Sequence, residues 1–191
     1  MLNIITDIVI HPKKCWEKVT TTDYTKIELF LYYVVPFALF AAVMSVIRLT
    51  LIGVKHNFNN IKKADFLPGL AFGAMEFVLL VFGVWITIIL INATLEAFKF
   101  RFPSILTYKL IIISIIPAFL GEIFLLFPAI SFVSIIIYGY SILIIYFGMK
   151  KMFKYLEEKL LSMFFIVVII LIFIFKFIFG ILNTMFINSL K

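Results

Sequence analysis

The feature that most constrains this chain is an almost uncharged stretch between Lys109 and Lys150. It is 40 residues long and contains a single ionisable side chain, Glu122. At about 1.5 Å of rise per residue it would form ~60 Å of helix, twice the ~30 Å hydrocarbon thickness of a bilayer. The stretch therefore has to turn back, and Gly121, Glu122 and Pro128 lie near its middle. It predicts two membrane spans joined by a short hairpin.

The composition indicates that the rest of the chain also belongs to a membrane protein. Of its 191 residues, 64% are hydrophobic and 14% are charged, whereas soluble domains carry about 25% charged residues. We therefore expect an all-α integral membrane protein with no separate soluble domain. The net charge of +7 does not call for nucleic acid, because basic residues of membrane proteins collect in cytoplasmic loops, where they meet anionic lipid headgroups.

Apolar runs divide the chain into a leading segment, residues 1–26, and a single five-span membrane domain, residues 27–191. The five predicted spans cover residues 27–53, 66–95, 103–121, 127–149 and 161–185. Thr25 and Glu28 have the spacing of a capping box directly before the first span. Pro36 inside that span predicts a kink about one turn earlier, near Tyr32 and Tyr33.

The leading segment has the pattern of a short amphipathic helix. Apolar side chains from Leu2 to Val9 share one helical face, and Pro12 then restarts the chain. Lys13, Lys14 and Trp16 follow, and basic residues with a tryptophan suit a helix that lies in the headgroup layer. The alternative is a solvated lead-in to the first span. The segment lacks the basic region and the cleavage site of a signal peptide.

The distribution of basic residues predicts the orientation. With five spans, the side that holds the N-terminus carries eleven basic residues, counting Lys109 near the start of the third span, and the opposite side carries four. This excess predicts a cytoplasmic N-terminus and a C-terminus outside or in a lumen. The heavy use of Ile, Phe, Lys and Asn is typical of an AT-rich genome and favours the cytoplasmic membrane of a prokaryote. The residues that we single out as the basic face of the cytoplasmic side are Lys13, Lys14, Lys99, Arg101, Lys150, Lys151 and Lys154.

Four ionisable residues fall within or at the edges of the spans: Arg48, Glu76, Glu122 and Lys176. In this topology all four belong to the outer half of the membrane. A lone charge at mid-bilayer costs at least ~2.5–3.5 kcal/mol, so we expect them to pair, and sequential spans favour Arg48 with Glu76. They form either a polar pocket or ion path that opens outward, or a structural ion pair with two snorkelling side chains.

Helix packing is indicated by small residues and prolines. Gly69 and Gly73 form a GxxxG pair, which lets a second helix approach closely. We favour packing within the chain over dimerisation and leave the oligomeric state open. Pro117 lies within the third span and Pro128 at the hairpin.

No enzyme motif is present, and the chain is expected not to be an enzyme. The sequence has neither an HExxH, a GxSxG, a P-loop nor a GxGxxG pattern. Cys15 is the only cysteine, and neither His11 nor His56 has a second ligand at a useful spacing. We therefore expect no catalytic residues, no cofactor and no metal site.

Four short features carry a resemblance to a known family. The first is a leader with a proline and an aromatic residue, HPKKCW at residues 11–16, and the second is a basic loop, FKFR at residues 98–101, before a span that contains Pro117. The third is a hairpin with Pro128, and the fourth is a span with tyrosine and glycine that ends in basic residues, at residues 138–151. In these features the chain resembles the prokaryotic form of the Yip1 family of small five-span membrane proteins.

The resemblance implies a non-enzymatic, multi-pass membrane protein with a cytoplasmic N-terminus. The N-terminal motif of the eukaryotic members is absent, so their role in vesicle trafficking is not carried over. We hypothesise a membrane-organising scaffold or adaptor, whose basic face meets anionic lipid headgroups and protein partners on the cytoplasmic side. The alternative is a small-molecule or ion transporter or channel that uses Glu76 and Arg48.

Overall fold

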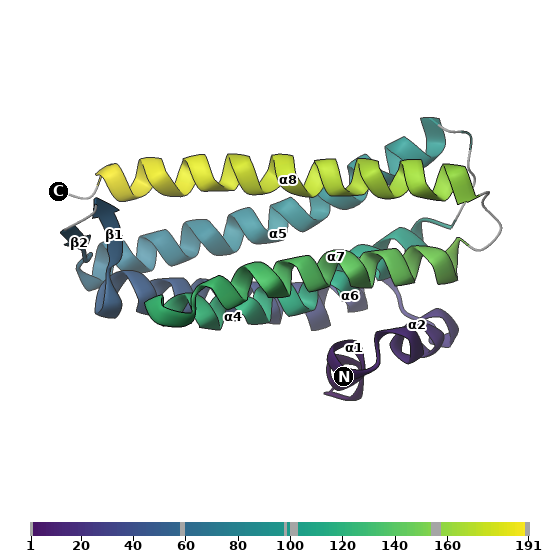
Figure 1. Ribbon diagram of the computed structural model, residues 1–191, viewed down its shortest axis with the longest axis horizontal. Coiled ribbons are helices and arrows are strands. Elements are labelled where there is room, and N and C mark those ends of the chain that lie inside the picture. The colour runs from purple at the N-terminus through teal and green to yellow at the C-terminus, as the bar shows by residue number, and fades with distance from the viewer. Residues whose placement is uncertain (1, 58–59, 98, 100–102, 154–157, 190–191) are drawn as a thin grey trace.

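The computed structural model describes residues 2–57, 60–97, 99, 103–153 and 158–189. Long helices dominate it and run side by side (Figure 1). The elements, in which η marks a π- or 3-10-helical turn, are α1 (Leu2–Ile10), α2 (Pro12–Thr21), α3 (Lys26–Leu29), η1 (Phe30–Val34), α4 (Val35–Ile47), η2 (Arg48–Ile52), β1 (Val54–Asn57), β2 (Asn60–Lys62), α5 (Phe66–Ala97), α6 (Ser104–Gly121), η3 (Glu122–Leu126), η4 (Pro128–Ile130), α7 (Phe132–Met152) and α8 (Glu158–Ser189).

The predicted number of membrane spans is confirmed. Within the described residues, five helical segments are long and apolar enough to cross a membrane: Lys26–Ile52, Phe66–Ala97, Ser104–Leu126, Phe132–Met152 and Phe164–Phe186. The chain is thus a predominantly helical, multi-pass membrane protein. The loop after the first span also holds a short antiparallel hairpin, β1–β2, which the sequence pattern did not indicate.

Local sequence signals explain how the first span begins. The capping box is present, since the Thr25 N–H donates to Glu28 Oε2 at 2.8 Å and the Glu28 N–H donates to Thr25 Oγ1 at 3.2 Å. Pro36 has no N–H to give, and its ring would clash with the carbonyl of Tyr32 in a regular helix. The chain accommodates this with the π-helical turn η1, in the turn where the kink was expected.

The hairpin between the third and fourth spans is present, but the fourth span begins later than predicted. Its helix, α7, starts at Phe132 rather than at residue 127. Phe127 is extended, with φ −111° and ψ 99°, because a residue that precedes proline is disfavoured in the α conformation. Pro128 then opens the short turn η4, which completes the reversal.

The core is organised around α6. Residues 110–114 of this helix are all buried, since α4, α5 and α7 pack around it and the short α1 and α2 cover it from the N-terminal side. By contrast, α8 lies at the edge of the bundle beside α5 (Figure 1). Phe186 of α8 packs on Phe72 of α5, with ring centroids 5.2 Å apart. Most of the described side chains of α8 face outward, as suits a lipid-facing span.

Candidate functional site

The N-terminal helices are docked on the bundle through Trp16. This side chain is fully buried, and its indole Nε1 donates a hydrogen bond to the carbonyl of Ile144 in α7 at 3.1 Å. The ring lies over Gly148, where a Cβ atom would come within 2.5 Å of it. The absence of a side chain at Gly148 therefore forms the notch that receives the indole. Trp16 contacts α7 and not the lipid headgroups that the sequence pattern suggested.

Three further hydrogen bonds, from two side chains of the bundle, hold the same segment in place. Tyr140 of α7 donates to the carbonyls of Ile8 at 3.0 Å and of Val9 at 2.9 Å. Lys109 of α6 donates from Nζ to the carbonyl of Thr22 at 2.8 Å. The Lys109 side chain is 5% exposed, and its ammonium group holds the connection between α2 and α3 against α6.

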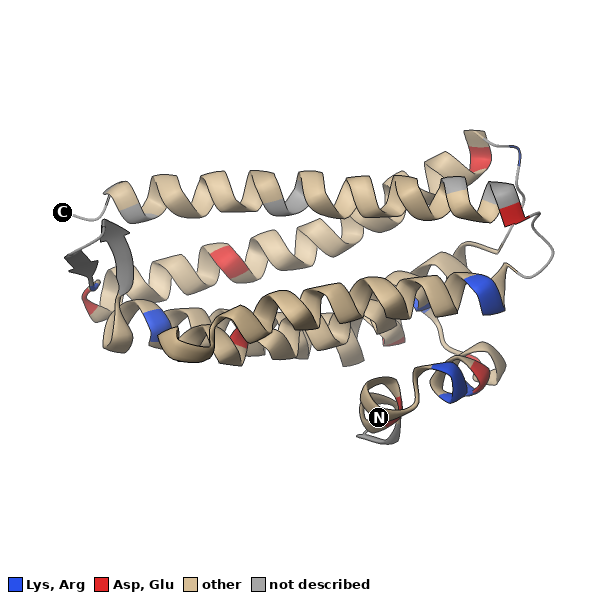
Figure 2. Ribbon diagram, in the orientation of Figure 1, with Lys and Arg blue, Asp and Glu red and all other residues tan. Residues whose placement is uncertain are grey.

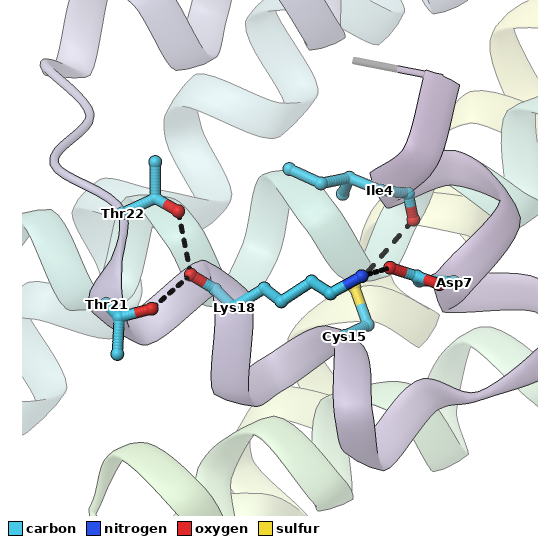
Figure 3. A network of polar contacts seen from close by, with 6 residues as sticks. All are labelled: Ile4, Asp7, Cys15, Lys18, Thr21 and Thr22. Atoms are coloured by element: carbon cyan, nitrogen blue, oxygen red, sulfur yellow. Dashed lines mark hydrogen bonds and ion pairs between the residues drawn. The ribbon is translucent and has the colours of Figure 1, made fainter.

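The junction of α1 and α2 contains a small polar network (Figure 3). Lys18 of α2 forms an ion pair with Asp7 of α1, and Thr21 and Thr22 donate from their hydroxyls to the carbonyl of Lys18. The thiol of Cys15 is buried and directed at the carbonyl of Ile4. Burial, with a smaller contribution from the Asp7 carboxylate, raises the pKa of Cys15 to about 11. It is a structural thiol and not a reactive one.

The structure brings part of the basic face together at one end of the bundle, where the C-terminal end of α7 lies near α2 (Figure 2). Lys151 of α7 forms an ion pair with Glu17 of α2, with 3.0 Å between Nζ and Oε1. The ammonium of Lys13 lies 5.4 Å from the ring centre of Phe147, and that of Lys150 lies 5.5 Å from that of Tyr146.

The remaining members of the basic face are placed only in part. Lys14 is exposed on α2 and Lys99 follows α5. Arg101 and Lys154 lie outside the described residues. Lys13 and Lys14 of α2 and Lys150 and Lys151 of α7 thus lie at the same end of the bundle although they are more than 130 residues apart in the sequence, and the docking of Trp16 joins their helices.

Three of the four intramembrane charges gather around a residue that the sequence pattern did not single out, Tyr138. Its hydroxyl donates to the carboxylate of Glu122, and it interacts electrostatically with Arg48 and Glu76 as well. Glu76 is 3% exposed. Lys176 belongs to α8, but its side chain lies outside the described part of the structure.

The pairing of Arg48 with Glu76 stays a prediction. The Nε atom of Arg48 is buried and donates to no acceptor among the described residues. Arg48 begins η2, which contacts the turn η3 that begins with Glu122.

The GxxxG glycines lie between the first two spans of the same chain. A Cβ atom on Gly69 would come within 2.2 Å of Thr50, and one on Gly73 within 2.3 Å of Val46. These two positions therefore set the close approach of α5 to α4 and η2. Of the two prolines, Pro117 is buried inside α6 and Pro128 begins η4.

Most of the chain matches a known family. A family model described as the Yip1 domain matches residues 6–179. The chain belongs to the Yip1 family. The resemblance predicted from the sequence is thereby confirmed, and the Yip1 match begins within α1 and ends within α8. Neither a curated protein nor a solved structure matches the chain detectably.

Proposed function

We propose that this Yip1-domain protein is a membrane-organising scaffold or adaptor that acts through its basic face on the cytoplasmic side. The observation that carries the proposal is the joining of α2 to the C-terminal end of α7. Lys13 and Lys14 come from one element and Lys150 and Lys151 from the other, and the ion pair between Lys151 and Glu17 lies between them.

This arrangement suits recognition of anionic groups. Each basic residue near an anionic membrane surface contributes about 1 kcal/mol of attraction, so four of them in one place can hold a negatively charged headgroup or an acidic protein segment. The Yip1 family is not a known enzyme family, and a non-enzymatic role in a prokaryotic cytoplasmic membrane agrees with the absence of an enzyme motif in the sequence.

The test compares paired lysine substitutions at the two ends of the bundle. We expect K13Q with K14Q, or K150Q with K151Q, to lower the recovery of cross-linked partners from membranes about tenfold or more, since two charges are worth about 2 kcal/mol. K62Q with K63Q removes the same charge at the opposite end and should leave recovery unchanged. E17Q breaks the ion pair with Lys151 but keeps all four lysines, so it separates the loss of charge from the loss of that contact.

Equal recovery from all of these variants would contradict the scaffold function.

The alternative is transport through a path lined by Glu76 and Arg48, and the gathering of charges around Tyr138 favours it. A surface depression along α8 is lined by Phe177, Gly180, Ile181, Thr184 and Met185 and does not include either of these two residues. Flux in liposomes that depends on Glu76 would support this alternative.

A further inference from the structure

We propose that α1 is inserted among the acyl chains of a single leaflet, the leaflet whose headgroups lie at the level of Lys150 and Lys151. This inference goes beyond the scaffold function and does not depend on it. It also differs from the headgroup position that the sequence pattern suggested for the segment, because the contacts of α1 place it deeper.

The depth of α1 follows from its hydrogen bonds to a membrane span. Tyr140 binds the carbonyls of Ile8 and Val9, and it lies ten residues before Lys150 in α7. Ten residues of helix correspond to about 15 Å, which is half of the ~30 Å hydrocarbon core. Even after allowance for the length of the tyrosine side chain, the C-terminal end of α1 lies well below the level of Lys150.

A second contact gives the order of the two N-terminal helices. Trp16 of α2 binds the carbonyl of Ile144, six residues before Lys150, which corresponds to about 9 Å of helix. The more polar α2 thus lies nearer the headgroups, and the more apolar α1 lies deeper. Figure 1 shows the same order, with α2 closer to the C-terminal end of α7 and α1 closer to its middle.

The side chains of α1 suit an apolar environment. Ile8 is fully buried against the bundle, whereas Val9 and Ile10 face outward, 49% and 60% exposed. The only ionisable side chain among its nine residues is Asp7, which is paired with Lys18 from α2. The outward face of Val9 and Ile10 lies at the depth of the lipid acyl chains. We therefore expect acyl chains to cover this face.

Insertion on one side has a consequence for the shape of the protein. The five spans displace lipid from both leaflets, whereas α1 displaces lipid from one leaflet only. The protein therefore occupies more area in the leaflet that surrounds α1 than in the opposite leaflet.

Spin-label accessibility in vesicles of zwitterionic and anionic phospholipid tests this depth. The full chain carries C15A, which removes its native cysteine. Three variants then each carry one labelled cysteine, at I10C, K14C or L143C. L143C is an exposed position of α7 seven residues before Lys150 and serves as the acyl-chain reference, and K14C serves as the headgroup reference. We expect the ratio of oxygen to nickel-chelate accessibility at I10C to match that at L143C and to exceed that at K14C several-fold.

A ratio at I10C equal to that at K14C would overturn the proposal, because α1 would then lie at the headgroups. Low accessibility to both reagents would also overturn it, since protein, such as a second copy of the chain, would then cover this face. A label at V9C repeats the measurement if I10C does not fold. Adding Y140F to I10C removes the hydrogen bonds to α1, and we expect the ratio to shift toward the headgroup value.

Discussion

Replacing Gly148 with alanine is expected to push the indole of Trp16 out of its site on α7. The new methyl group would lie 2.5 Å from Cζ2 and 2.6 Å from Cε2 of Trp16, and 2.7 Å from Cδ1 of Leu110. The indole is a rigid plane and cannot yield at one atom, so the whole ring has to move. Overpacking of this kind costs about 1–3 kcal/mol, and complete loss of a buried tryptophan costs about 3–5 kcal/mol.

The fluorescence of Trp16 reports this displacement. In a W85F background Trp16 is the only tryptophan, and we expect its emission in G148A to shift to longer wavelength and its quenching by acrylamide to increase several-fold. G139A is the matched control, because Gly139 lies in the same helix and a Cβ atom added there would meet nothing within 4 Å. An emission spectrum of G148A identical to that of G139A would contradict the docking of α2 on α7.

The second large effect is expected from alanine at Gly73. Its Cβ atom would lie 2.3 Å from Cγ2 of Val46 and 3.2 Å from the backbone carbonyl oxygen of Ala42. Valine has one strongly preferred rotamer in a helix, so its methyl group cannot swing away, and the backbone oxygen can yield only if α4 itself moves. We expect α4 and α5 to separate, at a cost of about 1–3 kcal/mol, and the midpoint of thermal unfolding in detergent to fall.

The control for this variant is G180A in α8, where a Cβ atom meets nothing within 4 Å. G180A should keep the unfolding midpoint of the unsubstituted protein. If Gly73 served dimerisation instead, G73A would lower the fraction of cross-linked dimer while the midpoint of the monomer stayed unchanged. That outcome would contradict the packing of α5 on α4 as the role of this glycine.

The sequence predicts those parts of the fold that depend on neighbouring residues. The five spans follow from runs of apolar side chains, because no other composition crosses a bilayer as a helix. The start of the first span follows from Thr25 and Glu28, and its π-helical turn follows from the steric demand of Pro36. The division into residues 1–26 and 27–191 and the assignment of the basic face stay predictions.

The contacts that build the site depend on residues far apart in the sequence. Trp16 and Gly148 are 132 positions apart, and no periodic pattern links them. A small residue among large apolar ones in α7 is the one local sign of the notch. The association of Tyr138 with Glu122 also escaped prediction, because it depends on the fold of η3 back toward α7.

Labelling with a membrane-impermeant maleimide tests whether the basic face lies on the cytoplasmic side. In the C15A chain, K14C reports the end of the bundle with the basic face and K63C reports the opposite end, and both side chains are exposed. We predict that K63C is labelled in intact cells and K14C only after the membrane is made permeable. Labelling of K14C but not of K63C in intact cells would contradict the predicted orientation and, with it, a cytoplasmic scaffold function.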